Sequence, residues 1–337
     1  MEDTATGRSK RFVIHGAGAI GSVFGGMLAR AGHQVTLVGR GSHMEAVREN
    51  GLVMDGLLGE HVIRGLETCT DLAAIGNKIP VTAVFLSTKS SDTAGAVLQL
   101  AQSGLVGDDT LVVSLQNGLG NLEQIRETFG WRRSFGGRVI FGAQVTQPGH
   151  VHVSVWADKV LIGGPEADSD HAAQSAGSRL ARTLTLSGLE TEMVDNIEAA
   201  LWGKVLYNVG LNPLSALLNV PYGELGRQKN SRTLLIALIK EAFSVASREA
   251  ALPWGTAEEY LELFFKQQLP STRSHRSSML QDMERGRETE IEAITGQVLS
   301  RAELLDLPVP VNRVVYEMVK AKVAINKIEN SELRIED

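Results

Sequence analysis

The chain has 337 residues and a formal net charge of −6, with 43% hydrophobic and 21% charged residues. The length predicts two domains or one large one, and the composition excludes a disordered chain. The mildly acidic balance argues against a protein that binds nucleic acid by neutralising phosphates. The only cysteine, Cys69, cannot form an internal disulfide and therefore indicates a reducing compartment.

No stretch of the sequence is apolar enough to predict a membrane span. The two most apolar stretches, 199–220 and 233–246, are interrupted by lysine, asparagine and glutamate, and a span needs about 18 clean residues. Near the N-terminus, the apolar run Phe12–Ile14 is too short for the core of a signal peptide, which has roughly 7–15 residues. We therefore expect a cytoplasmic protein without a membrane partner.

The first third of the chain predicts strands that alternate with helices. Four short apolar runs, rich in β-branched residues, are candidate strands: Arg11–His15, Gln34–Val38, Val81–Leu86 and Thr110–Leu115. Runs that are apolar on both faces are typical of a buried parallel sheet. The sequence thus predicts an α/β, Rossmann-type doubly wound domain at the N-terminus.

The pattern changes after about residue 134. Apolar and polar residues alternate between about 134 and 165 around a turn at Pro148-Gly149, which predicts a strand pair that completes the sheet. Further on, helix-forming composition predicts helices over 172–187, 196–218, 231–250, 257–267, 278–304 and 311–326. The predicted domains are therefore a Rossmann-type domain over 1–170 and an all-helical domain over 171–337.

A glycine cluster follows the first predicted strand and opens a helix: Gly16, Ala17, Gly18, Ala19, Ile20 and Gly21. In this context Gly16 permits a tight turn, Gly18 lets the backbone approach a pyrophosphate, and Gly21 lets the helix pack on the strand. The helix N-terminus adds free N–H groups for that anion. A tightly packed turn without a ligand is the alternative interpretation.

The end of the second predicted strand bears on which dinucleotide binds. An NAD site usually has an acidic residue there to hold the ribose 2′-hydroxyl, whereas this chain has Val38-Gly39-Arg40. A guanidinium can bind a 2′-phosphate through forked, charge-assisted hydrogen bonds. The pattern favours NADP(H), although Arg40 could instead be a solvated surface residue.

Lys89 and Asn117 follow the next two strands, so they also fall at the ligand-binding edge of the sheet, unless they cap helices or face solvent.

Lys204, Asn208 and Asn212 form one polar row on an otherwise apolar predicted helix, because their spacing is i, i+4, i+8. The row extends over about 12 Å, which suits a small oxygenated substrate. A solvent-exposed face is the alternative, but such a face is more often rich in Glu and Lys.

Further on, Ser278-x-x-Gln281 predicts a capping box, a purely structural role for that serine.

The histidines show no metal-binding pattern. His150 and His152 share one face of a predicted strand, but no third ligand is near them in sequence. We therefore predict no metal site.

Together these motifs resemble the ketopantoate reductase (2-dehydropantoate 2-reductase) family along nearly the whole chain. The glycine turn and Arg40 are joined by Lys89, QNGLG (116–120), W-x-K-x-x-x-N-x-x-x-N-P (202–213) and RSSMLQDM…TEI (276–291) in the family's order. The resemblance implies NADPH-dependent reduction of ketopantoate to pantoate, on the route to pantothenate and coenzyme A.

The resemblance also implies roles for individual residues. Lys204 is similar in position to the family's proton donor, and Asn208, Asn212 and Ser278 to its substrate-binding residues. Residues 16–21 and Arg40 match the family's cofactor site, which Lys89, Asn117, Val145 and Glu290 complete. An ammonium at Lys204 can stabilise and protonate the alkoxide that forms when hydride reaches a 2-keto carbon.

One position departs from the family. Tyr222 stands where the family often has an asparagine that reaches the substrate's hydroxyl end. Another branched or aromatic 2-keto acid, reduced to a D-2-hydroxy acid, is therefore an alternative substrate. A non-catalytic NADPH-binding regulator is the alternative from a different class. A homodimer through the helical domain is left open, since no apolar surface stripe was recognised in the sequence.

Overall fold

The computed structural model describes residues 9–76, 80–164 and 170–332. The chain divides into two compact units. Unit 1 contains the residues up to Gln116 and Asn121–Ile197, and unit 2 contains Asn117–Gly120 and the residues from Glu198 onward. The sequence-based boundary at 170 differs from this division, because the segment 171–197 lies in unit 1. No helix among the described residues is long and apolar enough to cross a membrane.

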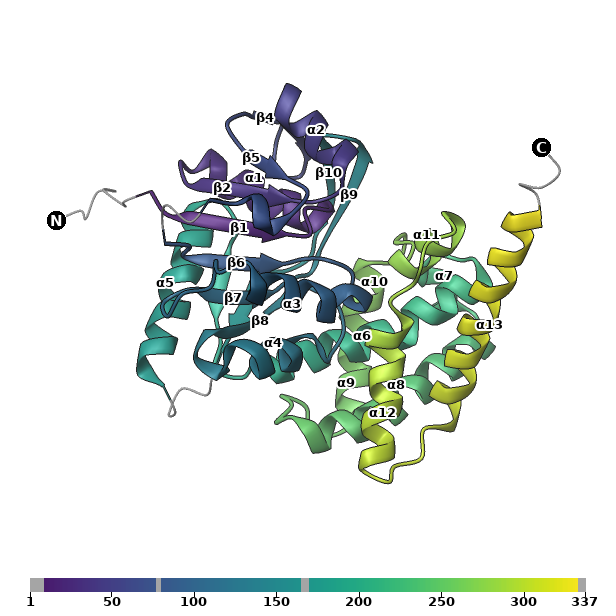
Figure 1. The fold of residues 1–337 in the computed structure, drawn as a ribbon. Coiled ribbons are helices and arrows are strands. Elements are labelled where there is room, and N and C mark those ends of the chain that lie inside the picture. Colours follow the sequence, from purple (N-terminus) through teal and green to yellow (C-terminus); the bar gives the residue numbers. More distant parts are fainter. Residues whose placement is uncertain (1–8, 77–79, 165–169, 333–337) are drawn as a thin grey trace. The chain divides into compact units, whose positions relative to one another are not determined.

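The main sheet of unit 1 has eight strands within the described ranges, in the order β12-β11-β8-β7-β6-β1-β2-β5 (Figure 1). Its strands are β1 (Arg11–His15), β2 (Gln34–Val38), β5 (Glu67–Cys69), β6 (Ala83–Leu86), β7 (Leu111–Ser114), β8 (Ser134–Arg138), β11 (Val160–Gly163) and β12 (Thr191–Met193). Neighbouring strands are parallel except β8 and β11. The four strands predicted for the first third are confirmed.

Helices cover both faces of this sheet, as a doubly wound fold requires. The helices of unit 1 are α1 (Ala19–Arg30), α2 (Gly41–Asn50), α3 (Thr93–Gln102), α4 (Asn121–Phe129) and α5 (His171–Leu186). One apolar core includes residues of α1 and α5, and a second core, on the other face, includes residues of α3 and α4. The chain passes from β1 outward through β2 and then returns to β6, so the strand order reverses between β1 and β6. Ligands of such sheets bind at the carboxyl ends of the strands near this reversal.

The strand pair around Pro148-Gly149 forms as predicted, but it does not complete the main sheet. β9 (Phe141–Gln147) and β10 (His150–Trp156) are antiparallel, and β10 pairs with β3 (Leu52–Gly56) in a second sheet of order β4-β3-β10-β9. β4 is His61–Ile63. Val151 and Val153 alternate with exposed His152 and Ser154, so this sheet buries only one face. A half-exposed pair of this kind suits a separate antiparallel layer better than a buried parallel sheet.

Unit 2 is helical within the described residues. Its helices are α6 (Ile197–Leu218), α7 (Tyr222–Arg227), α8 (Lys229–Glu249), α9 (Ala257–Leu263), α10 (Leu269–Ser271), α11 (Ser278–Glu284), α12 (Gln297–Leu304) and α13 (Pro310–Glu332), with single π-helical turns at Phe264–Gln268 and Glu292–Gly296. They pack around one apolar core.

The helix predicted over 278–304 is wrong in its middle. α11 ends at Glu284 and helical structure resumes only around Glu292. Gly286 has a φ of +62°, a left-handed conformation that glycine adopts readily and that ends a helix. The break determines where Glu290 lies.

Candidate active site

The glycine turn of unit 1 has the geometry that the sequence predicts. Gly16 has a φ of +101°, and a Cβ there would lie 2.3 Å from the backbone nitrogen of Thr88. A Cβ on Gly21 would lie 2.8 Å from Ile14 Cγ2. Both positions therefore exclude a side chain, because real Cβ atoms do not approach this closely. The two glycines let α1 start directly against the end of β1.

Gly18 differs from these two glycines, since a Cβ built on it would meet nothing closer than 3.9 Å. It is the N-cap residue of α1, so the backbone beside it is open where the first-turn N–H groups of Ala19 and Ile20 emerge. Such a helix start attracts an anion through its N–H groups and its dipole. The residues present thus fit the pyrophosphate of a dinucleotide.

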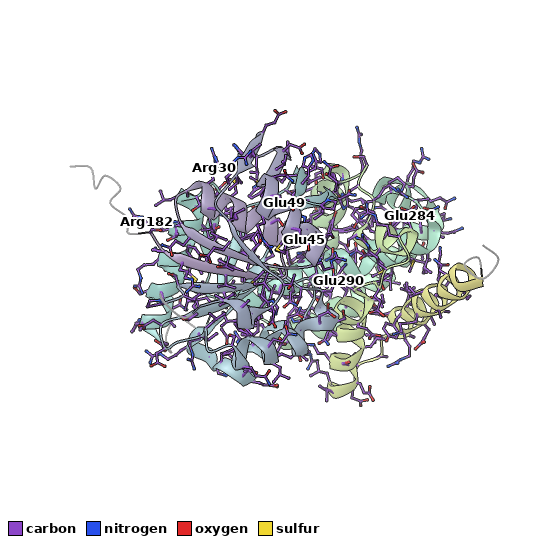
Figure 2. The ribbon with its side chains drawn as sticks, turned by 45° about the horizontal axis from the view of Figure 1, so that its top comes forward. Arg30, Glu45, Glu49, Arg182, Glu284 and Glu290 are labelled. Atoms are coloured by element: carbon purple, nitrogen blue, oxygen red, sulfur yellow. The ribbon has the colours of Figure 1, made fainter. Side chains whose placement is uncertain are left out.

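Arg40 is exposed and is the N-cap residue of α2, directly after β2. The described residues at the end of this strand include no carboxylate, as the Val38-Gly39-Arg40 sequence requires. Acidic residues appear only further along α2, where Glu45 and Glu49 are exposed (Figure 2). The position suits a cation for a phosphate at the edge of the sheet.

Buried His43 connects this segment to the glycine turn, a role that sequence analysis missed. Its Nδ1 accepts a hydrogen bond of 2.9 Å from Gly149 N–H, so its Nε2 carries the proton and donates to Ser22 Oγ at 3.0 Å. Ser22 Oγ also lies 3.5 Å from the carbonyl of Ala17. One neutral imidazole thereby fixes the start of α2, the start of α1 and the β9–β10 turn.

We expect the melting temperature to fall as the pH is lowered from about 7.5 to 5.5. Burial and the charge of Arg40 lower the pKa of His43 below its ordinary value of 6.5, and burial lowers the pKa of His15 likewise. Below the ordinary value the unfolded chain binds protons that the folded chain does not, so the free energy of unfolding falls. At a pH above the ordinary histidine pKa, the contribution of these two histidines to the free energy of unfolding is constant. Differential scanning calorimetry across the range tests this, and a His43→Gln variant with an unchanged slope would contradict the role of His43.

Two other residues of the predicted cofactor site also lie in unit 1. Lys89 follows β6 as the N-cap residue of the short 3₁₀ helix Ser90–Asp92, and its side chain is exposed. Val145 is half-buried on β9 of the second sheet, which packs against α1. Lys89 thus shares the β1–β6 edge with the glycine turn.

In unit 2, the predicted polar row lies on α6 and is not a solvent-exposed face. Asn208 is 9% and Asn212 is 4% exposed, while Lys204 is half-buried. Apolar side chains from the same helix, Trp202, Val205, Leu206 and Val209 among them, belong to the core of the unit. Buried amides need hydrogen-bond partners, which makes the partners of this row informative.

Lys204 lies at one end of a hydrogen-bonded chain. Its Nζ donates to Asn117 Oδ1 at 2.6 Å, and Asn117 Nδ2 donates to Glu290 Oε2 at 2.8 Å. Asn117 and Glu290 were predicted for the cofactor site, and the structure places both with Lys204 in unit 2. The amide of Asn117 thus links the ammonium of Lys204 to the carboxylate of Glu290, and this link orients the Lys204 side chain.

The loop at 117–120 is held in place by close backbone contact. Leu119 N–H donates to the carbonyl of Ala293 at 3.0 Å, inside the π-helical turn Glu292–Gly296. A Cβ on Gly118, whose φ is +80°, would lie 2.1 Å from that same oxygen. Only glycine permits this approach, and the approach brings Asn117 to Lys204. π-helical turns often occur at functional sites.

The other end of the row lies next to α11. The N-cap residue of α11 is Ser277, not Ser278: Ser277 Oγ accepts from Leu280 N–H at 3.0 Å and donates to the carbonyl of Asn212 at 3.4 Å. The predicted capping box is therefore wrong by one residue. Ser278 is exposed at the first position of the helix, so its hydroxyl is not used for the cap. Ser278 and Glu290 belong to opposite ends of the row, which the break after α11 permits.

Tyr222 is 3% exposed and its hydroxyl donates to Asn212 Oδ1 at 2.6 Å. Burial raises the pKa of Tyr222 well above its ordinary value, so the hydroxyl stays protonated. The ring packs edge-on against Tyr207, whose own hydroxyl lies 2.6 Å from Thr272 Oγ1. The residue that departs from the family is thus bonded directly to a predicted substrate-binding residue. The sequence does not predict this contact, because a tyrosine at position 222 does not by itself indicate which residue its hydroxyl will bond to.

We expect Tyr222→Phe to destabilise the protein by about 1–3 kcal/mol, because it leaves the buried Asn212 Oδ1 without its donor. Tyr207→Phe is the matched control: Thr272 Oγ1 still donates to the carbonyl of Gln268 at 2.9 Å, so the loss is smaller. Thermal unfolding of both variants provides the measurement. Equal losses of stability in the two variants would show that the hydrogen bond to Asn212 does not add to stability beyond what a tyrosine hydroxyl contributes elsewhere.

Two other features do not join the site. His150 and His152 both bond to Asp55 on the neighbouring strand, at 2.8 and 2.6 Å. Within the described residues, no group of three His, Cys, Asp or Glu side chains is suited to a metal ion.

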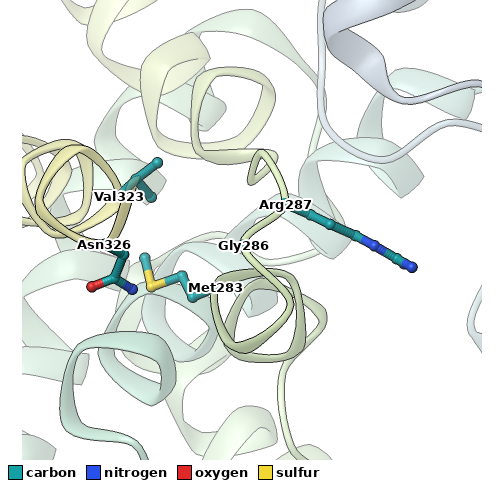
Figure 3. A pocket seen from close by; sticks show the side chains of 5 residues that line it. All are labelled: Met283, Gly286, Arg287, Val323 and Asn326. Carbon is teal, nitrogen blue, oxygen red and sulfur yellow. The ribbon is translucent and has the colours of Figure 1, made fainter. Parts of the chain in front are cut away.

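A small pocket of unit 2 lies between the end of α11 and α13, where Arg287 extends away from Met283 and Asn326 (Figure 3). None of the predicted site residues lines this pocket.

Comparison with known proteins decides the family. Residues 12–166 match the family model described as ketopantoate reductase PanE/ApbA, and residues 196–323 match the model of its C-terminal part. The chain belongs to the ketopantoate reductase family. As a member of this family it is an oxidoreductase that reduces a 2-keto acid with a pyridine nucleotide. The predicted family, fold class and enzyme class are confirmed.

Individual relatives cover nearly the whole chain. A 2-dehydropantoate 2-reductase of Aquifex aeolicus is 35% identical over 318 residues, which are 94% of this chain and 98% of the relative. The structure of a ketopantoate reductase of this family from Ralstonia eutropha JMP134 is 30% identical, with a TM-score of 0.82 over 94% of this chain and 99% of that one. The structure of a D-mandelate dehydrogenase with NADH is 26% identical, with a TM-score of 0.78 over 93% and 99%.

Proposed function

We propose that the protein reduces ketopantoate (2-dehydropantoate) to pantoate with NADPH, a step that leads to pantothenate and coenzyme A. The observation that carries the proposal is the Lys204–Asn117–Glu290 chain of hydrogen bonds at one end of a buried amide row. An ammonium in a largely buried polar row is costly unless it serves a ligand or a partner.

The residues of unit 1 that would hold the cofactor are the glycine turn, which suits the pyrophosphate, and Arg40, which suits a 2′-phosphate. Lys89 and Val145 are further proposed contacts. When bound, NADPH supplies a hydride to the 2-keto carbon. Support for the NADP(H) preference comes from the absence of an acidic residue at Val38-Gly39-Arg40.

The residues of unit 2 serve the substrate. Lys204 Nζ donates a proton to the carbonyl oxygen as negative charge develops there. An ammonium stabilises that charge better than a neutral donor does. Asn117 and Glu290, which are also proposed cofactor contacts, hold that amine in position. Asn208, Asn212 and the exposed hydroxyl of Ser278 provide donors for the substrate carboxylate and hydroxyl group.

A panel of 2-keto acids tests the substrate directly. We expect ketopantoate to give the highest kcat/KM, measured by the loss of nicotinamide absorbance with NADPH. A branched or aromatic 2-keto acid that surpasses ketopantoate would replace it as the substrate and would leave the reaction class intact. Tyr222 favours this second candidate, since its aromatic ring provides an apolar wall while its hydroxyl donates to Asn212 Oδ1. The similarity to a D-mandelate dehydrogenase points the same way.

The cellular location and the oligomeric state are parts of the proposal. The free thiol of Cys69 supports a reducing compartment such as the cytoplasm. A homodimer through unit 2 is supported by an apolar stripe on α13, where Val314, Met318 and Ile325 are 59%, 52% and 54% exposed. Their i, i+4, i+11 spacing places them on one face of the helix.

We expect the protein to sediment as a dimer and Met318→Glu to shift it toward the monomer, because a charge in an apolar interface is costly. Leu234→Glu is the matched control, since Leu234 is an exposed leucine on α8 outside the stripe. Sedimentation velocity over a range of protein concentrations gives the answer. A wild-type protein that remains monomeric at every concentration would refute the dimer.

A further inference from the structure

His15 is a buried histidine whose polarity the fold does not use. It is 7% exposed, and neither ring nitrogen has a hydrogen-bond partner among the described residues. A buried polar group without a hydrogen-bond partner destabilises the folded state, because it has lost its hydrogen bonds to water. His43, a buried histidine of the same unit, has a partner at each nitrogen. His15 is therefore an exception that needs an explanation.

The position of His15 points to a ligand. It is the last residue of β1 and directly precedes Gly16. Its register partners are Val38 on β2 and Leu86 on β6, which share an apolar core with Val13 of its own strand. Since side chains alternate along a strand, His15 shares this face and closes it at the carboxyl edge. The edge between β1 and β6 is where the strand order reverses and where ligands of this fold class bind.

The chemistry around His15 favours an uncharged ligand group. Burial lowers the pKa of His15 even though the charge of Asp71 opposes this effect, so the ring is neutral near pH 7. A neutral imidazole offers one donor and one acceptor. The negative charge of Asp71 disfavours a phosphate beside the ring, whereas a ribose hydroxyl or the edge of a purine base can both donate and accept.

We infer that His15 binds the adenosine half of the dinucleotide, through hydrogen bonds from its ring nitrogens to a ribose hydroxyl or to the edge of the base. The glycine turn next to it and Arg40 at the end of β2 would then hold the adjoining phosphates. The inference rests on the proposed dinucleotide function, but it assigns to His15 a contact that NADPH and NADH share.

The test compares wild type with His15→Leu by isothermal titration calorimetry, with ADP, NADH and NADPH as probes. We expect His15→Leu to weaken all three by a similar factor of about ten, because each loses the same contact. The melting temperature of the nucleotide-free variant should stay the same or rise, because leucine removes two unsatisfied polar atoms. The matched control is His33→Leu: His33 precedes β2 at the opposite edge of the sheet, and its Nδ1 accepts from Lys10 N–H.

Several outcomes would overturn the inference. A lower melting temperature with unchanged affinities would make His15 a structural group, and a loss confined to NADPH would move the contact to the 2′-phosphate. In wild type, the ¹⁵N resonances of the His15 ring, assigned by comparison with His15→Asn, should shift when ADP is added. No shift at saturating ADP would refute the contact. ADP lacks the 2′-phosphate, so the measurements with ADP test the His15 contact even if the protein does not prefer NADPH to NADH.

Discussion

Lys204→Ala should lower kcat by about 10²–10⁴-fold, because the variant loses the group that donates the proton and stabilises the developing alkoxide. The affinity for NADPH should change little, since the proposed cofactor residues 16–21 and Arg40 belong to unit 1 and Lys204 to unit 2. Steady-state kinetics with ketopantoate and calorimetry with NADPH separate the two effects.

Lys266→Ala is the matched control, because Lys266 is an exposed lysine of unit 2 that pairs with Glu262, one helical turn away. Its kcat should equal that of wild type. Lys204→Arg adds information, since arginine keeps the charge but releases its proton too reluctantly to act as an acid. A Lys204→Ala enzyme with undiminished kcat would exclude Lys204 as proton donor and would require another group for that role.

Arg40→Asp should reverse the preference between the two nicotinamide cofactors. Loss of charge-assisted hydrogen bonds to a phosphate costs about 1.5–3 kcal/mol, or roughly 10- to 150-fold in the dissociation constant of NADPH, and the new carboxylate adds repulsion. NADH should bind equally well or better, because an acidic residue at this position can hold the ribose 2′-hydroxyl.

The control for this variant is Arg48→Asp, on the same helix α2 and exposed, with Thr68 Oγ1 as its hydrogen-bond partner at 3.3 Å. It makes the same change in net charge and should alter the ratio of the two dissociation constants by only about twofold, since exposed charges beyond about 10 Å are screened. Equal effects of Arg40→Asp on NADPH and NADH would refute the assignment of Arg40 to the 2′-phosphate.

Much of the fold follows from local sequence patterns. The strands Arg11–His15 and Gln34–Val38 were found at their observed bounds, because a buried parallel strand is a short apolar run. The glycine turn was equally clear, since a positive φ at Gly16 and a close approach at Gly21 require those residues. Regular spacing also placed Lys204, Asn208 and Asn212 on one face of a helix.

Other predictions failed where a distant segment made the decision. The β9–β10 pair was recognised, but its pairing with β3 set it in a second sheet. The predicted helix over 278–304 continued through Gly286, because composition alone did not reveal the left-handed turn there. The cap at Ser277 was missed by one residue, since the two adjacent serines differ only in their surroundings.

The sequence by itself determined the fold class, the glycine turn and the polar row, because each depends on residues that are neighbours along the chain or along one helix. Only the tertiary structure decided that Asn117 links Lys204 to Glu290 and that Tyr222 bonds to Asn212. It also decided that His15 is buried with no hydrogen-bond partner in the part of the chain that the structure describes. These facts depend on contacts between segments far apart in sequence, and such contacts are set by the packing of the whole unit rather than by any local pattern.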